Sequence, residues 1–307
     1  MSKTYAAIDI GSNAARLLIK RNFADEKSSL PCLDKLMLLR VPLRLGFDVF
    51  DTGKISDKKK ENLIRLMKAY KQLMKIYDVE RYRACATSAM RDAANGCEII
   101  KDIKERADIK IDIIDGSEEA KILYANHAEK VDDPEGNYMY VDVGGGSTEL
   151  NFIQKGKLVL SRSFNVGTVR ILTGKVKDSV WSDIRKVCEE IYSKYGTVNL
   201  IGSGGNINKL YKLAKRKDEA HSILSVEELQ RIYGMLLPMS VKQRMEDLKL
   251  KPDRADVIIP AAQIFLTLST ILHSQYIIVP MIGVADGIID AMIEEDRIKQ
   301  LNKQLPK

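Results

Sequence analysis

A chain of 307 residues is long enough for two domains, and a hydrophobic content of 45% is typical of a protein that buries an apolar core. The net charge of +7 favours a polyanionic phosphate partner, whereas the low aromatic content of 6% argues against a stable nucleic acid partner. No uncharged apolar stretch reaches the ~18 residues of a membrane span. We therefore expect neither a membrane partner nor, because the N-terminus leads straight into a strand, a signal peptide.

The first half of the chain is predicted to alternate strands and helices after an opening run of three strands. Strands are expected at 4–11, 15–21, 36–45, 81–86 and 109–114, and helices at 57–77, up to about 106, and from 118 to about 130. Ser56 is the expected N-cap of the longest helix.

A breaker cluster at 132–137 separates the halves, and the hinge is predicted just before it. Beyond it, the order of three strands followed by alternating helices and strands returns. Strands are expected at 138–144, 147–154, 157–164, 199–201 and 276–281, and helices at 166–174, 181–195, from 206 to 273 with breaks near 220 and 250, and from 288 to about 304. This repeated order predicts an α/β duplication.

We therefore predict an α/β protein of two lobes. The first comprises residues 1–130, completed by the C-terminal helix at about 288–307, and the second comprises residues 131–287 with helical additions. The four cysteines lie far apart without a CxxC pair, which favours structural thiols in a reducing cytoplasm.

Two short motifs repeat the same chemical pattern, one in each half. Each has an apolar run, an aspartate, one apolar residue, a glycine and small polar residues: Asp9-Ile-Gly11-Ser12-Asn13 and Asp142-Val-Gly144-Gly145-Gly146-Ser147-Thr148-Glu149. Such a segment predicts a β-hairpin whose turn lacks side-chain bulk. Backbone N–H groups can then close on an anion, the hydroxyls of Ser147 and Thr148 add donors to it, and the carboxylate holds a hard cation. The pair predicts two lobes that clamp a phosphate–metal unit.

A third glycine cluster, at 202–205, follows a predicted strand and opens a helix. Gly204 and Gly205 are therefore candidates for an anion site at a helix N-terminus. Close packing of helix on strand explains the same glycines nearly as well, so both interpretations stay open.

Five motifs in this order resemble one family. They are Ala7–Asn13, Arg44-Leu45-Gly46, Ala86–Asn95, Gly116–Ala120 and Asp142–Glu149. The chain is similar to the exopolyphosphatase and guanosine pentaphosphate phosphohydrolase family, a branch of the actin-like ATPase superfamily. The resemblance implies two actin-like (ribonuclease H-like) lobes with a cleft between them, in the short two-domain form of a bacterial cytoplasmic enzyme.

The resemblance also implies an activity: Mg²⁺-assisted attack of water that releases the terminal phosphate of inorganic polyphosphate or guanosine pentaphosphate. Two alternatives stay open, because the loops alone do not distinguish water from an acceptor hydroxyl. One is an ATP-dependent small-molecule kinase, and the other is a catalytically weak sensor that binds an alarmone. A homodimer is also an open alternative.

Glu119 is the predicted catalytic residue. It lies in the first turn of a predicted helix, and the family's catalytic glutamate falls at this second Glu of the motif. A carboxylate there can orient and deprotonate the attacking water. The alternative is that Glu118 and Glu119 only complement the dipole of the helix.

The remaining site residues are expected to bind metal or phosphate. Asp142, Glu149 and Asp9 are the candidate Mg²⁺ ligands, although Glu149 could also be an exposed strand residue. Arg91 suits a bidentate hold on phosphate, with a surface salt bridge as the alternative. Arg16 and Arg254 are the candidates for distal substrate contacts.

Four positions depart from the family's usual pattern. They are Ala14, Phe47, Asn206 and the pair Ala285-Asp286. These departures affect the expected substrate preference, while the predicted base and metal ligands are all present.

Overall fold

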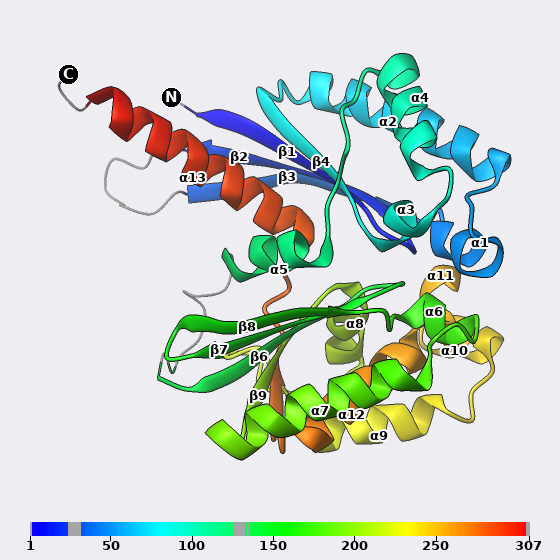
Figure 1. Ribbon diagram of the computed structural model, residues 1–307, viewed down its shortest axis with the longest axis vertical. Helices are drawn as coiled ribbons and strands as arrows, with labels where there is room; N and C mark the ends of the chain where they lie inside the picture. The colour runs from blue at the N-terminus through cyan, green and yellow to red at the C-terminus, as the bar shows by residue number, and fades with distance from the viewer. Residues whose placement is uncertain (1, 24–31, 126–132, 134, 305–307) are drawn as a thin grey trace. The chain divides into compact units, whose positions relative to one another are not determined.

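The computed structural model describes residues 2–23, 32–125, 133 and 135–304. The chain divides into two compact units, of which the first is Met1–Asn126 with Val284–Lys307 and the second is His127–Gly283. Figure 1 gives the element labels used below. The predicted domain boundary at 130/131 lies outside the described residues.

The first unit is built on a five-stranded mixed sheet with the order β3-β2-β1-β4-β5. Its strands are β1 (Lys3–Ile10), β2 (Ala15–Phe23), β3 (Cys32–Val41), β4 (Arg81–Ala86) and β5 (Asp112–Ile113). The first three pair antiparallel, whereas β4 and β5 extend the sheet in parallel. The central strand β1 is almost wholly buried, as a strand covered on both faces must be.

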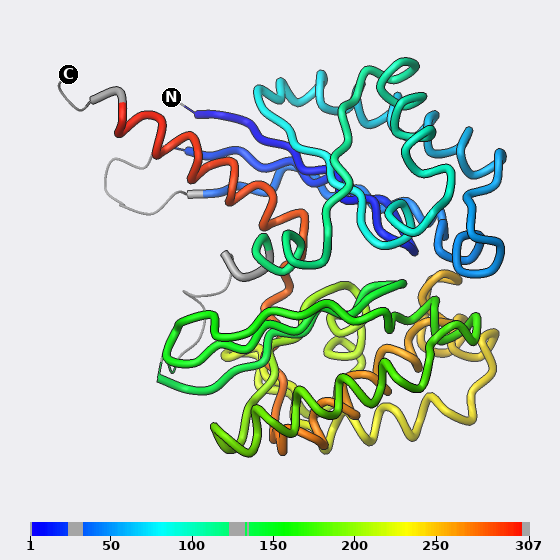
Figure 2. Tube along the Cα trace, in the orientation of Figure 1, coloured from blue at the N-terminus to red at the C-terminus, as the bar shows by residue number. Residues whose placement is uncertain are grey.

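The described residues of this unit form six helices beside the sheet. They are α1 (Leu45–Thr52), α2 (Asp57–Ile76), α3 (Ser88–Asp92), α4 (Gly96–Ala107), α5 (Gly116–Ala125) and α13 (Val284–Gln304). Although α13 is the last element of the chain, it packs against β1, β2, β4 and α5, and Figure 2 traces it beside these strands.

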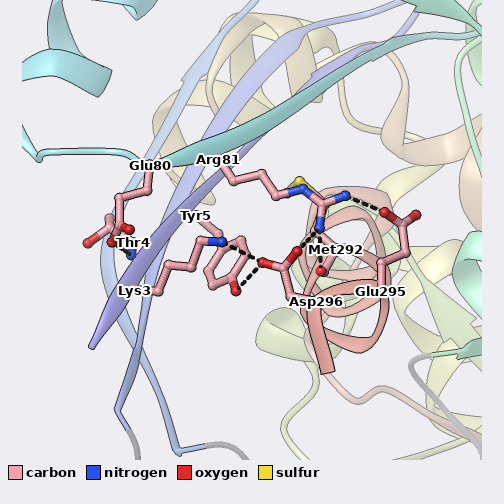
Figure 3. Close-up of polar contacts among 8 residues, drawn as sticks. All are labelled: Lys3, Thr4, Tyr5, Glu80, Arg81, Met292, Glu295 and Asp296. Atoms are coloured by element: carbon pink, nitrogen blue, oxygen red, sulfur yellow. Dashed lines mark hydrogen bonds and ion pairs between the residues drawn. The ribbon is translucent and has the colours of Figure 1, made fainter. Parts of the chain in front are cut away.

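Asp296 fastens α13 to the sheet (Figure 3). Its carboxylate accepts hydrogen bonds from Lys3 Nζ at 2.6 Å, from the Tyr5 hydroxyl at 2.9 Å and from Arg81. Burial, together with the hydrogen bond to Asp296, raises the pKa of Tyr5. A second ion pair, between Lys20 and Asp286 at 2.8 Å, holds the start of the helix.

The second unit repeats the strand order of the first and adds one strand. Its sheet has the order β10-β11-β9-β6-β7-β8. The strands are β6 (Asn137–Val143), β7 (Thr148–Gln154), β8 (Lys157–Phe164), β9 (Asn199–Ser203), β10 (Ile223–Ser225) and β11 (Tyr276–Ile278). As in the first unit, the first three strands pair antiparallel, and the next two in sheet order are parallel.

Where the structure describes this unit, it contains seven helices. They are α6 (Thr168–Leu172), α7 (Asp178–Tyr195), α8 (Gly205–Leu213), α9 (Val226–Leu236), α10 (Val241–Asp247), α11 (Pro252–Ala255) and α12 (Ile258–Ile271). The stretch Pro252–Ile271 is long and apolar enough to cross a membrane, but 61% of it is buried within the protein. It is explained by its contacts with α6, α7, α8 and α9, which make α12 a core helix.

The predicted α/β class is confirmed, with two mixed sheets that carry helices. Several element predictions are wrong in part. The final helix begins at Val284 rather than at 288, and the last strand ends at Ile278 rather than at 281. The third strand ends at Val41 rather than 45, because Arg44 adopts a left-handed conformation (φ 53°) from which α1 starts. The fifth strand is only two residues long. The segment expected to be helical around 223 contains β10, which pairs with β11.

Candidate active site

The first hairpin joins β1 to β2 through the turn at 11–14. The amide of Gly11 donates to the carbonyl of Ala14 at 3.1 Å, which closes the turn. Asp9 is buried and faces Arg16 across the strand pair, and Arg16 donates to its Oδ2 at 2.7 Å. The Asp9 carboxylate, which was expected to bind metal, therefore forms an ion pair with an arginine. The same arginine, Arg16, was expected to contact a distal part of the substrate.

The turn of this hairpin is held by backbone bonds from the start of α1. Arg44 N donates to Asn13 O at 2.9 Å, and Gly46 N donates to Ser12 O at 2.8 Å. The Ser12 hydroxyl lies 2.7 Å from that of Ser88 at the start of α3. The candidate phosphate loop at 11–13 is thus fixed by two separate elements before any ligand binds.

The two adjacent glutamates of α5 have different surroundings. Asp115 precedes the helix, and its side chain accepts from Glu118 N at 2.8 Å. The Glu118 carboxylate, 45% exposed, pairs with Arg83 of β4, whereas Glu119 is buried at 6% exposure. Glu118 therefore anchors α5 to β4 of the sheet.

Arg91 lies on α3, and its guanidinium donates to the carbonyl of Ile114 at 2.9 Å. Ile114 lies just before α5, so Arg91 holds the segment that leads to Glu119. The Arg91 guanidinium also forms an ion pair with Asp92 at 3.9 Å, which is the kind of contact that the alternative interpretation expected. The phosphate contact of Arg91 stays a prediction.

The second hairpin joins β6 to β7 and has the same turn. Gly144 N donates to Ser147 O at 3.0 Å. Asp142 faces Glu149 directly across the strand pair, with exposures of 7% and 1%, and a carboxylate oxygen of each lies within 4.8 Å of the other. Glu149 is therefore not the exposed strand residue of the alternative interpretation.

Two buried carboxylates at this separation repel each other, and a cation relieves the repulsion. Carboxylate oxygens are also the ligands that hard divalent cations prefer. The donor set of Asp142 and Glu149 therefore fits a divalent metal ion.

The carbonyl groups of the second turn are bound by the segment that begins α6. Thr168 N donates to Gly144 O at 3.0 Å and Val169 N donates to Gly145 O at 2.8 Å. Arg170 Nε reaches Gly146 O at 2.8 Å. Within the part of the chain that the structure describes, the amides of Gly145 and Gly146 make no hydrogen bond to protein, so they are available to an anion.

Gly167 is a residue of this site that the sequence reasoning missed. A Cβ at position 167 would lie 2.5 Å from the carbonyl carbon of Gly145, so the close approach of α6 to the turn needs glycine. A glycine at the second position of the helix predicted at 166–174 was the available signal. Thr148 also differs from expectation, because its hydroxyl donates to Val166 O at 2.6 Å rather than facing an anion.

The third glycine cluster lies beside the second hairpin, since Ser203 of β9 pairs with Asp142 of β6. Gly204 has a φ of 92°, and a Cβ there would lie 2.8 Å from Asp142 Oδ1. Arg254 of α11 packs on Gly205 and donates to Asn206 Oδ1 at 2.6 Å. Asn206, which departs from the family's usual pattern, therefore binds Arg254, a candidate for a distal substrate contact, at the start of α8.

The family of the chain follows from comparison with known proteins. The sequence profile of the Ppx/GppA phosphatase family matches residues 24–296, so the chain belongs to this family. It is 27% identical, over 94% of its length, to a bifunctional 3-dehydroquinate synthase/phosphatase of Fusobacterium nucleatum, and 24% identical, over 95%, to a guanosine-5'-triphosphate,3'-diphosphate pyrophosphatase of Aeromonas salmonicida.

A crystal structure of the Aquifex aeolicus Ppx/GppA family member matches the fold with a TM-score of 0.74. That protein is 25% identical, and the match covers 96% of this chain and 99% of that one. The two curated relatives are longer. The chain spans about half the length of the curated relatives it matches, with 46% of the Fusobacterium protein and 60% of the Aeromonas protein covered.

Proposed function

We propose that this protein is a phosphohydrolase that releases the terminal phosphate of inorganic polyphosphate or guanosine pentaphosphate. The observation that carries the proposal is the match of the Ppx/GppA phosphatase family to residues 24–296. The name of the Aeromonas relative supports a guanosine polyphosphate as one substrate. The buried carboxylates and available turn amides of the second hairpin support phosphate chemistry independently.

In this proposal the amides of Gly145 and Gly146 bind the oxygens of the terminal phosphate. Their carbonyls are already bound by α6, so the turn is preorganised and does not have to rearrange when the anion binds. The turn at 11–13 and the start of α8 at Gly204 and Gly205 are the proposed sites for the remaining phosphate oxygens.

Asp142 and Glu149 would hold a divalent cation, which we propose is Mg²⁺. When bound, such an ion neutralises the charge of the phosphate oxygens in the transition state. The protein's own contribution is to hold two carboxylates on adjacent strands at a fixed separation.

Glu119 is the proposed general base. It accepts a proton from water, whose oxygen attacks the terminal phosphorus while the bond to the bridging oxygen breaks and the shortened chain leaves. Glu118 is tied to Arg83, and the burial of Glu119 suits a base that works away from bulk water.

A substrate panel tests the proposal. The purified chain is incubated with Mg²⁺ and either polyphosphate or guanosine pentaphosphate, and released phosphate is timed. ATP with sugars and acids as acceptors is assayed in parallel. Phosphate release to water supports the hydrolase. Transfer to an acceptor without release would establish the kinase alternative, and tight binding of guanosine pentaphosphate without turnover would establish the sensor.

We further propose a cytoplasmic location in a bacterium. Cys85, Cys97 and Cys188 are free thiols, as a reducing compartment would keep them, and burial raises the pKa of Cys85 and of Cys188 to about 12. We also propose that the protein forms a homodimer and has no nucleic acid or membrane partner. Light scattering of the purified chain measures the oligomeric state. Cell fractionation tests the location.

A further inference from the structure

Ser163 is a direct neighbour of the proposed metal ligand Glu149. It lies on β8, the edge strand of the second sheet, and faces Glu149 of β7 in the antiparallel register. Its hydroxyl donates a hydrogen bond to Glu149 Oε1 at 2.9 Å. Because both residues sit on paired strands, the sheet itself sets the distance between hydroxyl and carboxylate.

The residue that the strand register places opposite Glu149 on β8 differs in charge from the residue that it places opposite Asp9 on β2. Arg16 brings a positive charge to Asp9, whereas Ser163 brings a single proton donor without charge. A hydroxyl can fix the rotation of a carboxylate and leave its negative charge available to a cation. An arginine at the same place would compete with the cation.

We propose that Ser163 is a positioning residue that orients the carboxylate of Glu149 for a divalent cation. Hydrogen bonds to the outer oxygen of a ligating carboxylate are a recurring feature of metal sites and raise their affinity. The inference rests on the proposed function only for its activity readout, because cation binding can be measured without a substrate.

Ser163 is itself solvent-exposed and lies on an edge strand, so its replacement removes little packing. A purely structural role would be to satisfy a buried carboxylate in the metal-free protein. That role predicts a change in the melting temperature of the metal-free protein without a change in cation affinity. The positioning role predicts a change in cation affinity.

The test uses two substitutions whose side chains, threonine and valine, have the same shape as each other. Ser163→Thr keeps the hydroxyl, and Ser163→Val has the same shape without it. Mn²⁺ binding to the full chain is measured by electron paramagnetic resonance, and the Mg²⁺ concentration for half-maximal phosphate release is measured in parallel. Ser163→Val should weaken Mn²⁺ binding about 10-fold, the low end for such partners because water can reach the site. Ser163→Thr should stay within about twofold of the parent.

Ser161→Val is the matched control, since Ser161 lies on the same strand and faces Asn151 rather than Glu149. It should leave Mn²⁺ affinity unchanged. Equal affinities of the Thr and Val variants, or no Mn²⁺ binding by the parent chain, would overturn the inference. If Ser163→Val alone weakens Mn²⁺ binding and the parent chain hydrolyses neither substrate, the positioning role of Ser163 is upheld while the proposed function is refuted.

Discussion

The two hairpins have the same backbone hydrogen-bond pattern and differ in the charge of the residue that faces their aspartate. In both, an aspartate stands one residue pair before a four-residue turn, which a glycine amide closes onto the fourth residue. Arg16 faces Asp9 in the first hairpin, and Glu149 faces Asp142 in the second. The first hairpin thus places a cationic side chain opposite its aspartate, whereas the second places another carboxylate there.

This difference teaches that a repeated motif does not imply a repeated site. The sequence pattern treats Asp9 and Asp142 as equivalent metal ligands, yet only the second hairpin concentrates negative charge. We therefore base the metal proposal on Asp142 and Glu149 alone. The first unit would contribute its phosphate loop and, through α5, the base.

The largest expected effect belongs to that base. Glu119→Gln should lower kcat by ~10²–10⁴, the usual contribution of a positioned base, while KM changes little because the amide keeps size and polarity. Steady-state phosphate release measures both constants. An unchanged kcat in the Glu119→Gln variant would contradict the assignment of the base to the first unit.

Glu118→Gln is the control for this substitution. It loses the pairing with Arg83 and a helix-dipole interaction of ~0.3–1 kcal/mol, and turnover should stay near that of the parent. Loss of turnover in Glu118→Gln with an active Glu119→Gln variant would move the base to the neighbouring residue.

The next effect compares the hairpins directly. Glu149→Gln should raise the Mg²⁺ concentration needed for half-maximal activity by about 10²-fold or more, since it removes a ligand rather than an outer partner. Titration of phosphate release against Mg²⁺ measures the shift.

Asp9→Asn is the matching substitution in the first hairpin. It should leave the Mg²⁺ requirement within about twofold and lower stability by about 1–3 kcal/mol, because Arg16 loses its ionic partner. Calorimetry measures that loss. A large rise in the Mg²⁺ requirement of Asp9→Asn would show that both hairpins bind metal.

A smaller effect concerns the glycines that support each turn. Gly167→Ala should lower turnover by roughly 10- to 100-fold, because its Cβ meets the backbone of Gly145, and a shift of about 1 Å in a binding loop is costly. Kinetics at saturating Mg²⁺ measures the loss.

Gly46→Ala makes the equivalent change at the first turn. Its Cβ would meet side-chain atoms, a ring carbon of Phe50 at 2.8 Å and the Cβ of Ser12 at 2.9 Å. The Phe50 ring can turn aside, although the Cβ of Ser12 moves only with its backbone. Gly167→Ala instead meets three backbone atoms at 2.5–2.6 Å, so the effect of Gly46→Ala on turnover should be the smaller. The reverse order would mean that the first turn carries the more critical phosphate contacts.

The smallest expected effect on activity belongs to a residue outside both hairpins, Glu228, which serves as a reference for the substitutions above. The side chain of Arg231 lowers the pKa of Glu228 from its usual 4.5 to about 2, with help from the amides of Lys215 and Arg216. A depressed pKa stabilises the fold above pH 4.5, and that stabilisation disappears as the pH falls towards 2. Glu228→Gln should therefore lower stability at neutral pH by about 1–3 kcal/mol.

Thermal unfolding between pH 2 and 7 measures this contribution. The difference between parent and Glu228→Gln should shrink as the pH falls from 4.5 to 2, while Mg²⁺ dependence at pH 7 stays unchanged. A constant difference across this pH range would remove ionisation of Glu228 as the cause.

Much of the fold could be predicted from the sequence, because hydrophobic periodicity and glycine-bearing turns are local signals. Both hairpins, the strand at 157–164 and the helix after Ser56 lie where the pattern places them. The strand β10 was missed because it is three residues long and exists through its pairing with β11. Such a strand leaves too short a pattern to detect.

The site shows the same division between local and distant signals. The residues within each turn were found from the motif, and their catalytic and binding roles stay predictions. Ser163, Gly167 and the pairing of Arg16 with Asp9 depend on strand register or on the docking of α6. The local sequence does not predict which side chain lies opposite a carboxylate, because this depends on the register of the paired strands.

The fastening of α13 by Asp296 has a consequence for synthesis on the ribosome. The first unit lacks the apolar side chains of Ile288, Ile289 and Met292, all buried, until the last segment of the chain emerges. Residues 127–283 are made in between, over roughly 10–30 s at bacterial elongation rates. The second unit can therefore complete its fold first, while the earliest strands wait for the final helix.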